Sequence, residues 1–398
     1  MDEQKILDIR MMNRFLTEGL EIIERPVYRE IQKRAKEGLI VVLKGLRRTG
    51  KSTLLKYYLL SHKEDAFYYS FDEEEYPEQK DLNDVINYAL SMGKKVIGLD
   101  EIQKISGWAG TVKKYYDHTN VRFLLSGSSS LDIKSGSESL AGRRIDIMIR
   151  PLTFNEYTMF KPFPYIEEYL STGFPEMLIK NIEPKPYLNS IIDKVVNQDI
   201  PKVFNVRKPQ VFDDLVRLLA ERNTGLLDYR DIATDIEISK DTVKEYVRIL
   251  EESYLIKVLP VFSKRYSSSA RRLKKIMFAF PSLADVLYPQ NKGTVYENII
   301  YHHIQDLGEV YFWREKYWEV DFVVKRGNQI LPIEVKSGSV NKKDATALLR
   351  FMEKFNVKDG LIVSKDTLDR FVMNGRRVKV VPFTAFLEDP NLEKWLTR

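Results

Sequence analysis

The chain has 398 residues, of which 43% are hydrophobic and 30% are charged, and its formal net charge is +6. It contains no cysteine, which excludes a disulfide framework, a thiolate zinc site and a cysteine nucleophile. Its apolar runs are shorter than the roughly 18 residues that span a bilayer, and the opening residues do not read as a signal peptide. We therefore expect a cytoplasmic protein without a membrane partner.

The first motif places a phosphate-binding turn between an apolar strand and a helix, in VVLKGLRRTGKSTLL at residues 41–55. It fits the pattern G-x-x-x-x-G-K-[ST], whose glycines let backbone N–H groups point at phosphate oxygens. We assign Lys51 to the β- and γ-phosphates and Ser52 to Mg²⁺. The predicted nucleotide-binding residues are Gly45, Leu46, Arg47, Arg48, Thr49, Gly50, Lys51, Ser52, Thr53 and Asp100.

Two further strands end in polar residues that suit nucleotide hydrolysis. The strand in KKVIGLDEIQKI ends in Asp100, which we assign to Mg²⁺, and Glu101, which we assign as the base that activates the attacking water. The strand in VRFLLSGSSS ends in Ser126, whose hydroxyl could sense the γ-phosphate. Arg143 and Arg144 follow. They could stabilise transition-state charge, in the same subunit or from a neighbour, or form surface salt bridges.

Several segments, in this order and spacing, carry a family resemblance. They are GLRRTGKST, GLDEIQKI, LLSGSSS and AGRR with RPLTFNEY, supported by ERPVYRE, STGFPEMLI and VVNQDIPKV. Over nearly its whole length the chain resembles prokaryotic AAA+ ATPases that carry a C-terminal PD-(D/E)XK nuclease-like domain. The resemblance implies ATP rather than GTP, and the chain shows no guanine-reading N-K-x-D motif. Because AAA+ sites often form between subunits, it also makes a homo-oligomer plausible.

The middle of the chain reads as two helices followed by a strand, in residues 227–262. Lys240, Lys244 and Arg248 recur every four residues, so they share the helix face that a recognition helix would present to the major groove. Residues 263–276 then hold six basic residues and no acidic one, which favours contact with DNA phosphates at the tip of a winged helix. A structural joint or a protein contact remains an alternative. The predicted DNA-binding residues are Lys240, Lys244, Arg248, Arg265, Arg271, Arg272, Lys274 and Lys275.

In WEVDFVVKRGNQILPIEVKSG two apolar strands flank a turn, so Asp321 can lie close to Glu334 across the hairpin. Two carboxylates and Lys336 can bind a divalent metal, Mg²⁺ or Mn²⁺, and promote attack on a phosphodiester. Glu297 lies upstream on a helix, beside His302 and His303, which we interpret as partly buried. The resemblance implies that Glu297, Asp321, Glu334 and Lys336 are the nuclease set. An active nuclease, an inactive binding domain and a salt-bridged hairpin stay open.

The fold class predicted is α/β: a P-loop AAA+ ATPase core with a parallel sheet, a helical lid, a winged helix and a C-terminal PD-(D/E)XK-like α/β domain. The function predicted is a Mg²⁺-dependent ATPase that binds DNA and couples ATP hydrolysis to the nuclease-like domain, in repair, recombination or mobile-element processing. The alternative is a nucleotide-gated switch or scaffold whose nuclease-like domain is silent and binds DNA or protein. The expected domains are residues 1–36 (helical segment), 37–155 (ATPase core), 156–207 (lid), 208–280 (winged helix) and 281–398 (nuclease-like domain).

Overall fold

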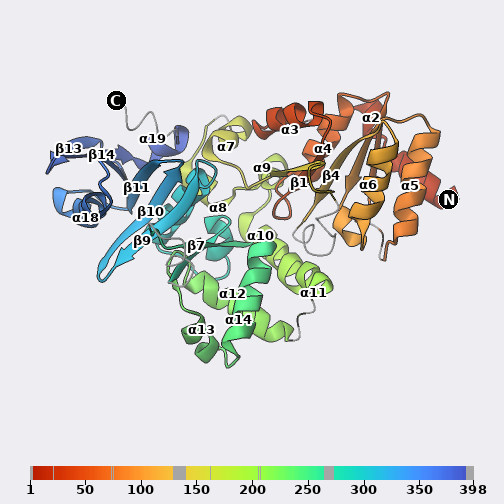
Figure 1. Cartoon of the computed structure of the whole chain (residues 1–398). Coiled ribbons are helices and arrows are strands. Elements are labelled where there is room, and N and C mark those ends of the chain that lie inside the picture. Colours follow the sequence, from red (N-terminus) through yellow and green to blue (C-terminus); the bar gives the residue numbers. More distant parts are fainter. Residues whose placement is uncertain are drawn as a thin grey trace. The chain divides into compact units, whose positions relative to one another are not determined.

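The computed structural model divides into two compact units (Figure 1). The first unit comprises residues 1–151, 174–179 and 252–254, and the second comprises residues 152–173, 180–251 and 255–398. The residues that the structure describes are 3–20, 22–72, 74, 76–128, 140–161, 163–204, 206, 208–263 and 273–390. Among them, none of the helices combines the length and the apolar character that a membrane span requires.

The first unit is built on a parallel five-stranded sheet with the strand order β2-β3-β4-β1-β5. Every residue of β1 and β3 is buried, because helices cover both faces of the sheet and each strand must be apolar on both sides. The strands are β1 (Ile40–Lys44), β2 (Ala66–Ser70), β3 (Val96–Asp100), β4 (Arg122–Gly127) and β5 (Arg144–Met148).

Two hydrophobic cores lie on opposite faces of this sheet. Along β1, Val41 and Leu43 pack with α3 and α4, whereas Ile40 and Val42 pack into the core that contains α5 and α6. This alternation is what a pleated strand dictates. The helical elements of the unit are α1 (Glu3–Met12), α2 (Phe15–Glu18), α3 (Val27–Lys36), α4 (Lys51–Leu60), α5 (Gln79–Ser91), the 3₁₀ turn η1 (Ile102–Lys104) and α6 (Trp108–His118).

The second unit begins with helices that the sequence predicts as a lid or connector. A π-helical segment, η3 (Lys194–Asp199), joins two of them without a break. The helices are α7 (Phe154–Phe160), α8 (Ile166–Ser171), α9 (Pro175–Lys180, which belongs largely to the first unit), α10 (Pro184–Asp193), α11 (Ile200–Val203) and α12 (Pro209–Glu221).

A small antiparallel sheet with the order β6-β8-β7 follows. The Ser239 hydroxyl accepts the Thr242 N–H at 3.1 Å, so it serves the start of α14 as an N-cap would. Val243, Val247 and Leu250 form the buried stripe of that helix. The elements are β6 (Leu226–Leu227), α13 (Tyr229–Asp235), α14 (Lys240–Glu252), β7 (Ile256–Pro260) and β8 (Lys274–Phe278).

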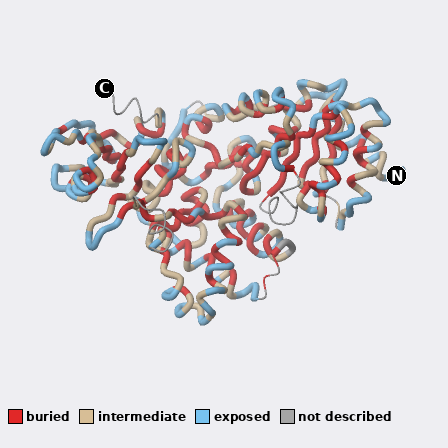
Figure 2. Tube along the Cα trace, in the orientation of Figure 1, coloured by how far each residue is buried: buried red, intermediate tan, exposed pale blue. Residues whose placement is uncertain are grey.

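The C-terminal part contains a mixed six-stranded sheet with the order β13-β14-β12-β11-β10-β9. Strands β9 to β11 form an antiparallel meander, and β11, β12 and β14 run parallel. Figure 2 shows buried residues concentrated in the strands of both units. The elements are α16 (Pro281–Asp285), α17 (Lys292–Ile304), β9 (Glu309–Glu315), β10 (Trp318–Arg326), β11 (Gln329–Lys336), η4 (Lys342–Ala345), α18 (Thr346–Phe355), β12 (Asp359–Ser364), β13 (Asp369–Met373), β14 (Arg376–Pro382) and α19 (Phe383–Glu388).

Candidate nucleotide site and C-terminal carboxylate cluster

The predicted phosphate loop follows the carboxyl end of β1 and leads into α4. Gly45 has φ +140°, and a Cβ there would lie 2.1 Å from the carbonyl oxygen of Ile149, so only glycine fits. Gly50, immediately before the helix, has φ +93°. The first N–H groups of a helix have no acceptor within it, so this end of α4 is suited to an anion.

The ammonium of Lys51 lies over this loop. The side chain is buried, and Nζ donates hydrogen bonds to the carbonyl oxygens of Gly45 and Leu46, each at 2.9 Å. Thr49 Oγ1 also donates to Leu46 O, at 2.9 Å. Ser52 and Thr53 lie in the first turn of α4, where Ser52 is half-buried and Thr53 is exposed. Loop, lysine and hydroxyl together fit a nucleotide phosphate with its Mg²⁺.

Asp100 is the last residue of β3, and its buried carboxylate accepts several hydrogen bonds. Its Oδ2 accepts the Tyr68 hydroxyl at 2.9 Å, and its Oδ1 accepts the Glu101 N–H at 3.1 Å and the Ser126 hydroxyl. Ser126 is fully buried, and its hydroxyl orients the predicted Mg²⁺ ligand. The structure thus gives Ser126 a positioning contact with Asp100, and its contact with the γ-phosphate stays a prediction.

Glu101 is held in place by side chains that the sequence does not single out. Gln103 Nε2 donates to the Glu101 carboxylate and, at 3.1 Å, to Ser128 Oγ, which lies 3.4 Å from Glu101 Oε2. Burial raises the pKa of Glu101, the charge of Lys51 opposes that rise, and Asp100 adds to it. The only sequence signal for this network is the position of Gln103 and Ser128 just beyond two predicted strand ends.

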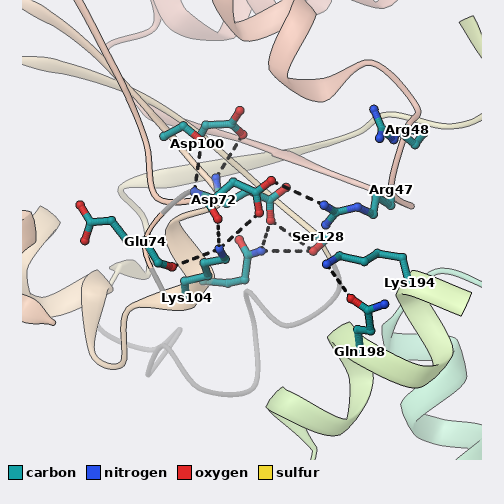
Figure 3. A network of polar contacts seen from close by, with 12 residues as sticks. Arg47, Arg48, Asp72, Glu74, Asp100, Lys104, Ser128, Lys194 and Gln198 are labelled. Carbon is teal, nitrogen blue, oxygen red and sulfur yellow. Dashed lines mark hydrogen bonds and ion pairs between the residues drawn. The ribbon is translucent and has the colours of Figure 1, made fainter. Parts of the chain in front are cut away.

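The two loop arginines have different partners. Arg47 extends toward Asp72, with Nη2 3.5 Å from Oδ2, whereas Arg48 lies apart from Asp72 (Figure 3). Arg48 Nη1 pairs with Glu176 Oε2 at 2.8 Å, within the first unit. Arg47 also adds positive charge near Glu101 and helps to lower the pKa of that carboxyl. Arg47 is therefore the loop arginine on the side of the predicted base.

Arg25 holds the phosphate loop through hydrogen bonds to the backbone. It is buried, and its Nη1 donates to Thr49 O at 2.7 Å while its Nη2 donates to Arg150 O at 3.0 Å. The guanidinium therefore joins the loop to the backbone that follows β5. Arg25 lies in the segment ERPVYRE, which the sequence singles out only through the family resemblance. No local pattern predicts which distant backbone groups its long side chain contacts.

The predicted catalytic role of Arg143 and Arg144 within one subunit is wrong. Arg144 pairs with Ile40 at the start of β1, whereas the phosphate loop follows Lys44 at its other end. Four residues of strand separate the two places by about 13 Å. Arg143 Nε contacts Asp117 at 2.8 Å, and Arg144 Nη2 contacts Asp146 at 3.2 Å. A role in the site of a neighbouring subunit stays a prediction.

Some of the predicted DNA contacts lie on the surface and one does not. On α14, Lys244 and Arg248 are exposed and Lys240 is half-buried, with Lys244 Nζ 2.7 Å from Asp241. Lys274 lies over the ring of Tyr229. Lys275, by contrast, is buried, which overturns its prediction as a DNA contact, since it lies on the middle strand of the small sheet, where only Lys274 at the start of the strand is partly exposed. Arg265, Arg271 and Arg272 lie outside the described residues.

Lys275 enters a cluster of three carboxylates. Its Nζ contacts Glu297 Oε1 from α17, and from β10 it contacts Glu319 Oε1 at 2.9 Å and Asp321 Oδ1 at 3.7 Å. Burial alone would lower the pKa of Lys275, but the carboxylates outweigh it and hold that pKa above its usual value. Burial raises the pKa of Glu297 to about 8, although Lys275 opposes the rise. Glu319 was not among the predicted residues.

Asp321 and Glu334 lie side by side across the β10–β11 hairpin. Asp321 Oδ2 accepts the Val335 N–H at 2.8 Å, and Lys336 Nζ donates to Glu334 Oε1 at 2.6 Å. Burial and the charge of Asp321 raise the pKa of Glu334 to about 8. Within the described part of the chain, no group of three or more His, Cys, Asp or Glu side chains is arranged to hold a metal ion.

His302 and His303 are buried more completely than the sequence suggests. His302 Nε2 lies 3.2 Å from Leu152 O. His303 Nε2 accepts the Phe154 N–H at 3.1 Å, and its Nδ1 lies 2.9 Å from Ile299 O. Both ring nitrogens of His303 therefore have backbone partners. The geometry is that of a structural histidine.

Comparison with known proteins divides the chain into three matched regions. The family described as "AAA domain" matches residues 37–158, and two domains of unknown function, DUF8612 and DUF4143, match residues 164–292 and 292–386. The uncharacterized protein MJ1544 of Methanocaldococcus jannaschii is 27% identical over 83% of this chain and 82% of its own length. An uncharacterized protein of Haemophilus influenzae is 24% identical over 85% and 89%.

Two solved structures align weakly with this chain. The Thermotoga maritima RuvB Holliday junction branch migration motor aligns with a TM-score of 0.32 and 13% identity, covering 57% of this chain and 88% of that one. Drosophila ORC bound to AT-rich DNA and Cdc6 aligns at 0.24 and 9%, covering 72% and 94%. Such scores transfer no function. The sequence match and the phosphate loop on its parallel sheet together make residues 37–158 an AAA-type P-loop ATPase domain.

Proposed function

We propose that this chain is a Mg²⁺-dependent ATPase that binds DNA and uses ATP binding and hydrolysis to control how its C-terminal part engages that DNA. The observation that carries the ATPase is the convergence of Lys51, Asp100 and Glu101 at the carboxyl ends of β1 and β3, two parallel strands with β4 between them. In open α/β sheets this edge, where strand order reverses, is where ligands bind.

Each residue has a distinct task in this proposal. The loop N–H groups and Lys51 bind the triphosphate, and Ser52 and Asp100 hold the Mg²⁺ that neutralises charge on the phosphates. Glu101 orients the attacking water and accepts its proton, while Gln103 and Ser128 keep its carboxylate in place. Ser126 and Tyr68 do the same for Asp100.

DNA binding is proposed for the middle of the second unit. Helix, strand, two helices and a β-hairpin follow one another from α12 to β8, which is the order of a winged helix. Lys240, Lys244 and Arg248 lie along α14, and the basic segment 263–276 begins after β7 and ends within β8. Acidic residues are interspersed on α14, so contact with phosphates is better supported than the reading of bases.

The C-terminal part is proposed to be a PD-(D/E)XK-like domain. Its α17, meander β9–β11, α18 and β12 succeed one another as in that fold, and Glu297, Asp321, Glu334 and Lys336 are all present. The sequence left open whether the domain cleaves or is silent. The ammonium of Lys275 among the carboxylates favours the second candidate, a nucleotide-gated switch whose nuclease-like domain only binds.

The test is ATP hydrolysis with and without DNA at two salt concentrations. Lys51→Ala should abolish turnover, and Glu101→Gln should bind ATP but hydrolyse it poorly, whereas Lys63→Ala, an exposed lysine beyond α4, should behave as wild type. DNA should stimulate turnover most at low salt, because phosphate contacts release counterions. Undiminished hydrolysis by Lys51→Ala would refute the proposed nucleotide site. If none of the DNA substrates stimulates hydrolysis, the chain would be an ATPase that acts with protein partners only.

Cleavage is tested separately. Labelled single-stranded, duplex and branched DNA would be incubated with Mg²⁺ or Mn²⁺, with and without ATP, using wild type and Glu334→Ala. Metal-dependent cutting that Glu334→Ala abolishes would support a nuclease and reject the silent switch. Intact DNA in the presence of protein that hydrolyses ATP would support the switch.

A further inference from the structure

We propose that Lys275 is the resident cation of the C-terminal carboxylate cluster, and that this centre therefore takes no divalent metal. The Lys275 ammonium already contacts Glu297, Glu319 and Asp321, which come from two different elements. Two of these are residues that the sequence assigns to a nuclease centre. The carboxylates are all present, but the cation that they surround is the ammonium of Lys275 and not a metal ion.

The lysine is fixed where it is. It stands on β8, the middle strand of the small sheet, and is paired with Leu226 on one side and Leu259 on the other. Its side chain is 2% exposed, and the ring of Phe312 lies 5.9 Å from Nζ. The ammonium cannot leave the carboxylates without either burying a charge alone or moving a paired strand.

A divalent ion does not fit beside it. Mg²⁺ requires oxygen ligands at about 2.0–2.1 Å in near-octahedral geometry. Here the oxygens are spread around an ammonium, and a second cation among them would be repelled at close range in a buried site. The described residues contain no three-ligand group suited to a metal.

The remaining oxygens do not make up a second site. Asp321 Oδ2 is used by the Val335 N–H, and Glu334 Oε1 is used by Lys336. Glu334 Oε2 is a buried oxygen without a hydrogen-bond partner among the described residues. One such oxygen could be reached by a metal, but the neighbouring carboxylates that would complete its coordination are held by Lys275.

The cluster therefore acts as an ionic joint. It ties β8 of the small sheet to α17 and β10 of the C-terminal sheet, all within the second unit. This inference concerns the silent form of the proposed function but does not depend on the ATP site. Failure of ATP hydrolysis would leave it standing, and its own failure would leave the ATPase standing.

The experiment is Mn²⁺ binding to the full chain without nucleotide, followed by electron paramagnetic resonance of the free ion. Wild type should have no Mn²⁺ site that depends on Glu297. Lys275→Met should gain one such site, and Lys275→Met combined with Glu297→Gln should lose it again. The matched control is Lys257→Met, which removes an exposed lysine from the adjacent strand and should leave Mn²⁺ binding unchanged.

Two outcomes would overturn the proposal. The first is a Mn²⁺ site in wild type that Glu297→Gln or Glu334→Ala abolishes, because the metal then coexists with Lys275 or displaces it. The second is a folded Lys275→Met protein that gains no site. If Lys275→Met does not fold, the wild-type titration alone decides, since it needs no lysine variant.

Discussion

Gln103 donates a hydrogen bond to the carboxylate of Glu101 from the short 3₁₀ turn that follows β3. Glu101 itself adopts φ +52°, a left-handed conformation that is uncommon for residues other than glycine. Backbone and side chain are thus both constrained at the residue proposed as the base. The arrangement fixes where the carboxylate lies and how readily it gives up its proton.

Replacing Gln103 with leucine should move the acid limb of ATP hydrolysis to higher pH. Burial raises the pKa of Glu101, and the hydrogen bond from Gln103 lowers it by favouring the ionised form. Without that bond the pKa rises further, so less base is ionised at a given pH on the acid side. A pH profile of kcat measures the shift. Ser128→Ala should shift it less because its contact is 3.4 Å long. An unmoved limb in Gln103→Leu would point to another base.

The positions of Arg143 and Arg144 predict that they do not serve their own subunit. Changing both to alanine should leave ATP hydrolysis unchanged at dilutions where the protein is monomeric, because they lie at the amino end of β5. At concentrations that allow self-association, mixing this double variant with Glu101→Gln tests a role between subunits. Recovery of activity on mixing would show that role, and a loss already present in the monomer would contradict the assignment.

Arg25→Met should loosen the phosphate loop. The change removes charge-assisted hydrogen bonds to Thr49 O and Arg150 O, and it should lower the free energy of unfolding by about 2–4 kcal/mol. It should also raise the KM for ATP more than it lowers kcat. Arg25→Lys should rescue little, because an ammonium lacks the planar fork that reaches both carbonyls. Thermal unfolding and steady-state kinetics measure both effects, with Arg29→Met on exposed α3 surface as control. Wild-type KM in a folded Arg25→Met protein would contradict a positioning role.

His303 should make the second unit less stable in acid. Burial lowers its pKa to about 4, whereas a histidine in the unfolded chain has a pKa of about 6.5. As the pH falls through this window the unfolded state binds the proton first, so stability present above pH 6.5 is lost toward pH 4. The loss attributable to this group is at most about 3 kcal/mol.

The measurement is the difference in unfolding free energy between wild type and His303→Gln across this range, since other buried groups titrate too. That difference should change with pH. The corresponding difference for His118→Gln, an exposed histidine, should stay nearly constant. Parallel curves for wild type and His303→Gln would mean that His303 binds its proton over the same pH range in the folded and the unfolded chain, so that its pKa is not lowered by folding.

The parts of the site that the sequence predicted best are those whose chemistry is local. A glycine-rich turn that ends in Gly-Lys-Ser between an apolar strand and a helix is specific to phosphate binding, so Gly45 to Ser52 could be placed from the order of residues alone. Asp100 and Glu101 followed from a strand end. Asp321 and Glu334 followed from the alternation of a hairpin whose turn was visible in the sequence.

The predictions that failed concerned residues whose position depends on the three-dimensional fold. Arg143 and Arg144 follow β4 in the sequence, but β5 runs parallel to β1, so its first residue lies at the end of the sheet opposite to the phosphate loop. Lys275 was counted with a basic surface segment because composition does not reveal which side of a strand faces inward. Arg25 contacts Thr49 and Arg150, and Gln103 contacts Glu101 and Ser128, and none of these contacts follows a periodic pattern in the sequence.

The ion pair between Arg48 and Glu176 has a practical consequence for anyone who wishes to study the ATPase alone. Glu176 comes from a short stretch that returns to the first unit after an excursion into the second, and residues 252–254 return in the same way. The matched family ends at residue 158, before either return. A fragment cut there would leave Arg48 without its partner and expose Gly50 where Pro175 lies within 3.8 Å of its would-be Cβ. A fragment that keeps the Arg48–Glu176 pair and Pro175 beside Gly50 therefore has to extend beyond the matched family, at least through residue 179.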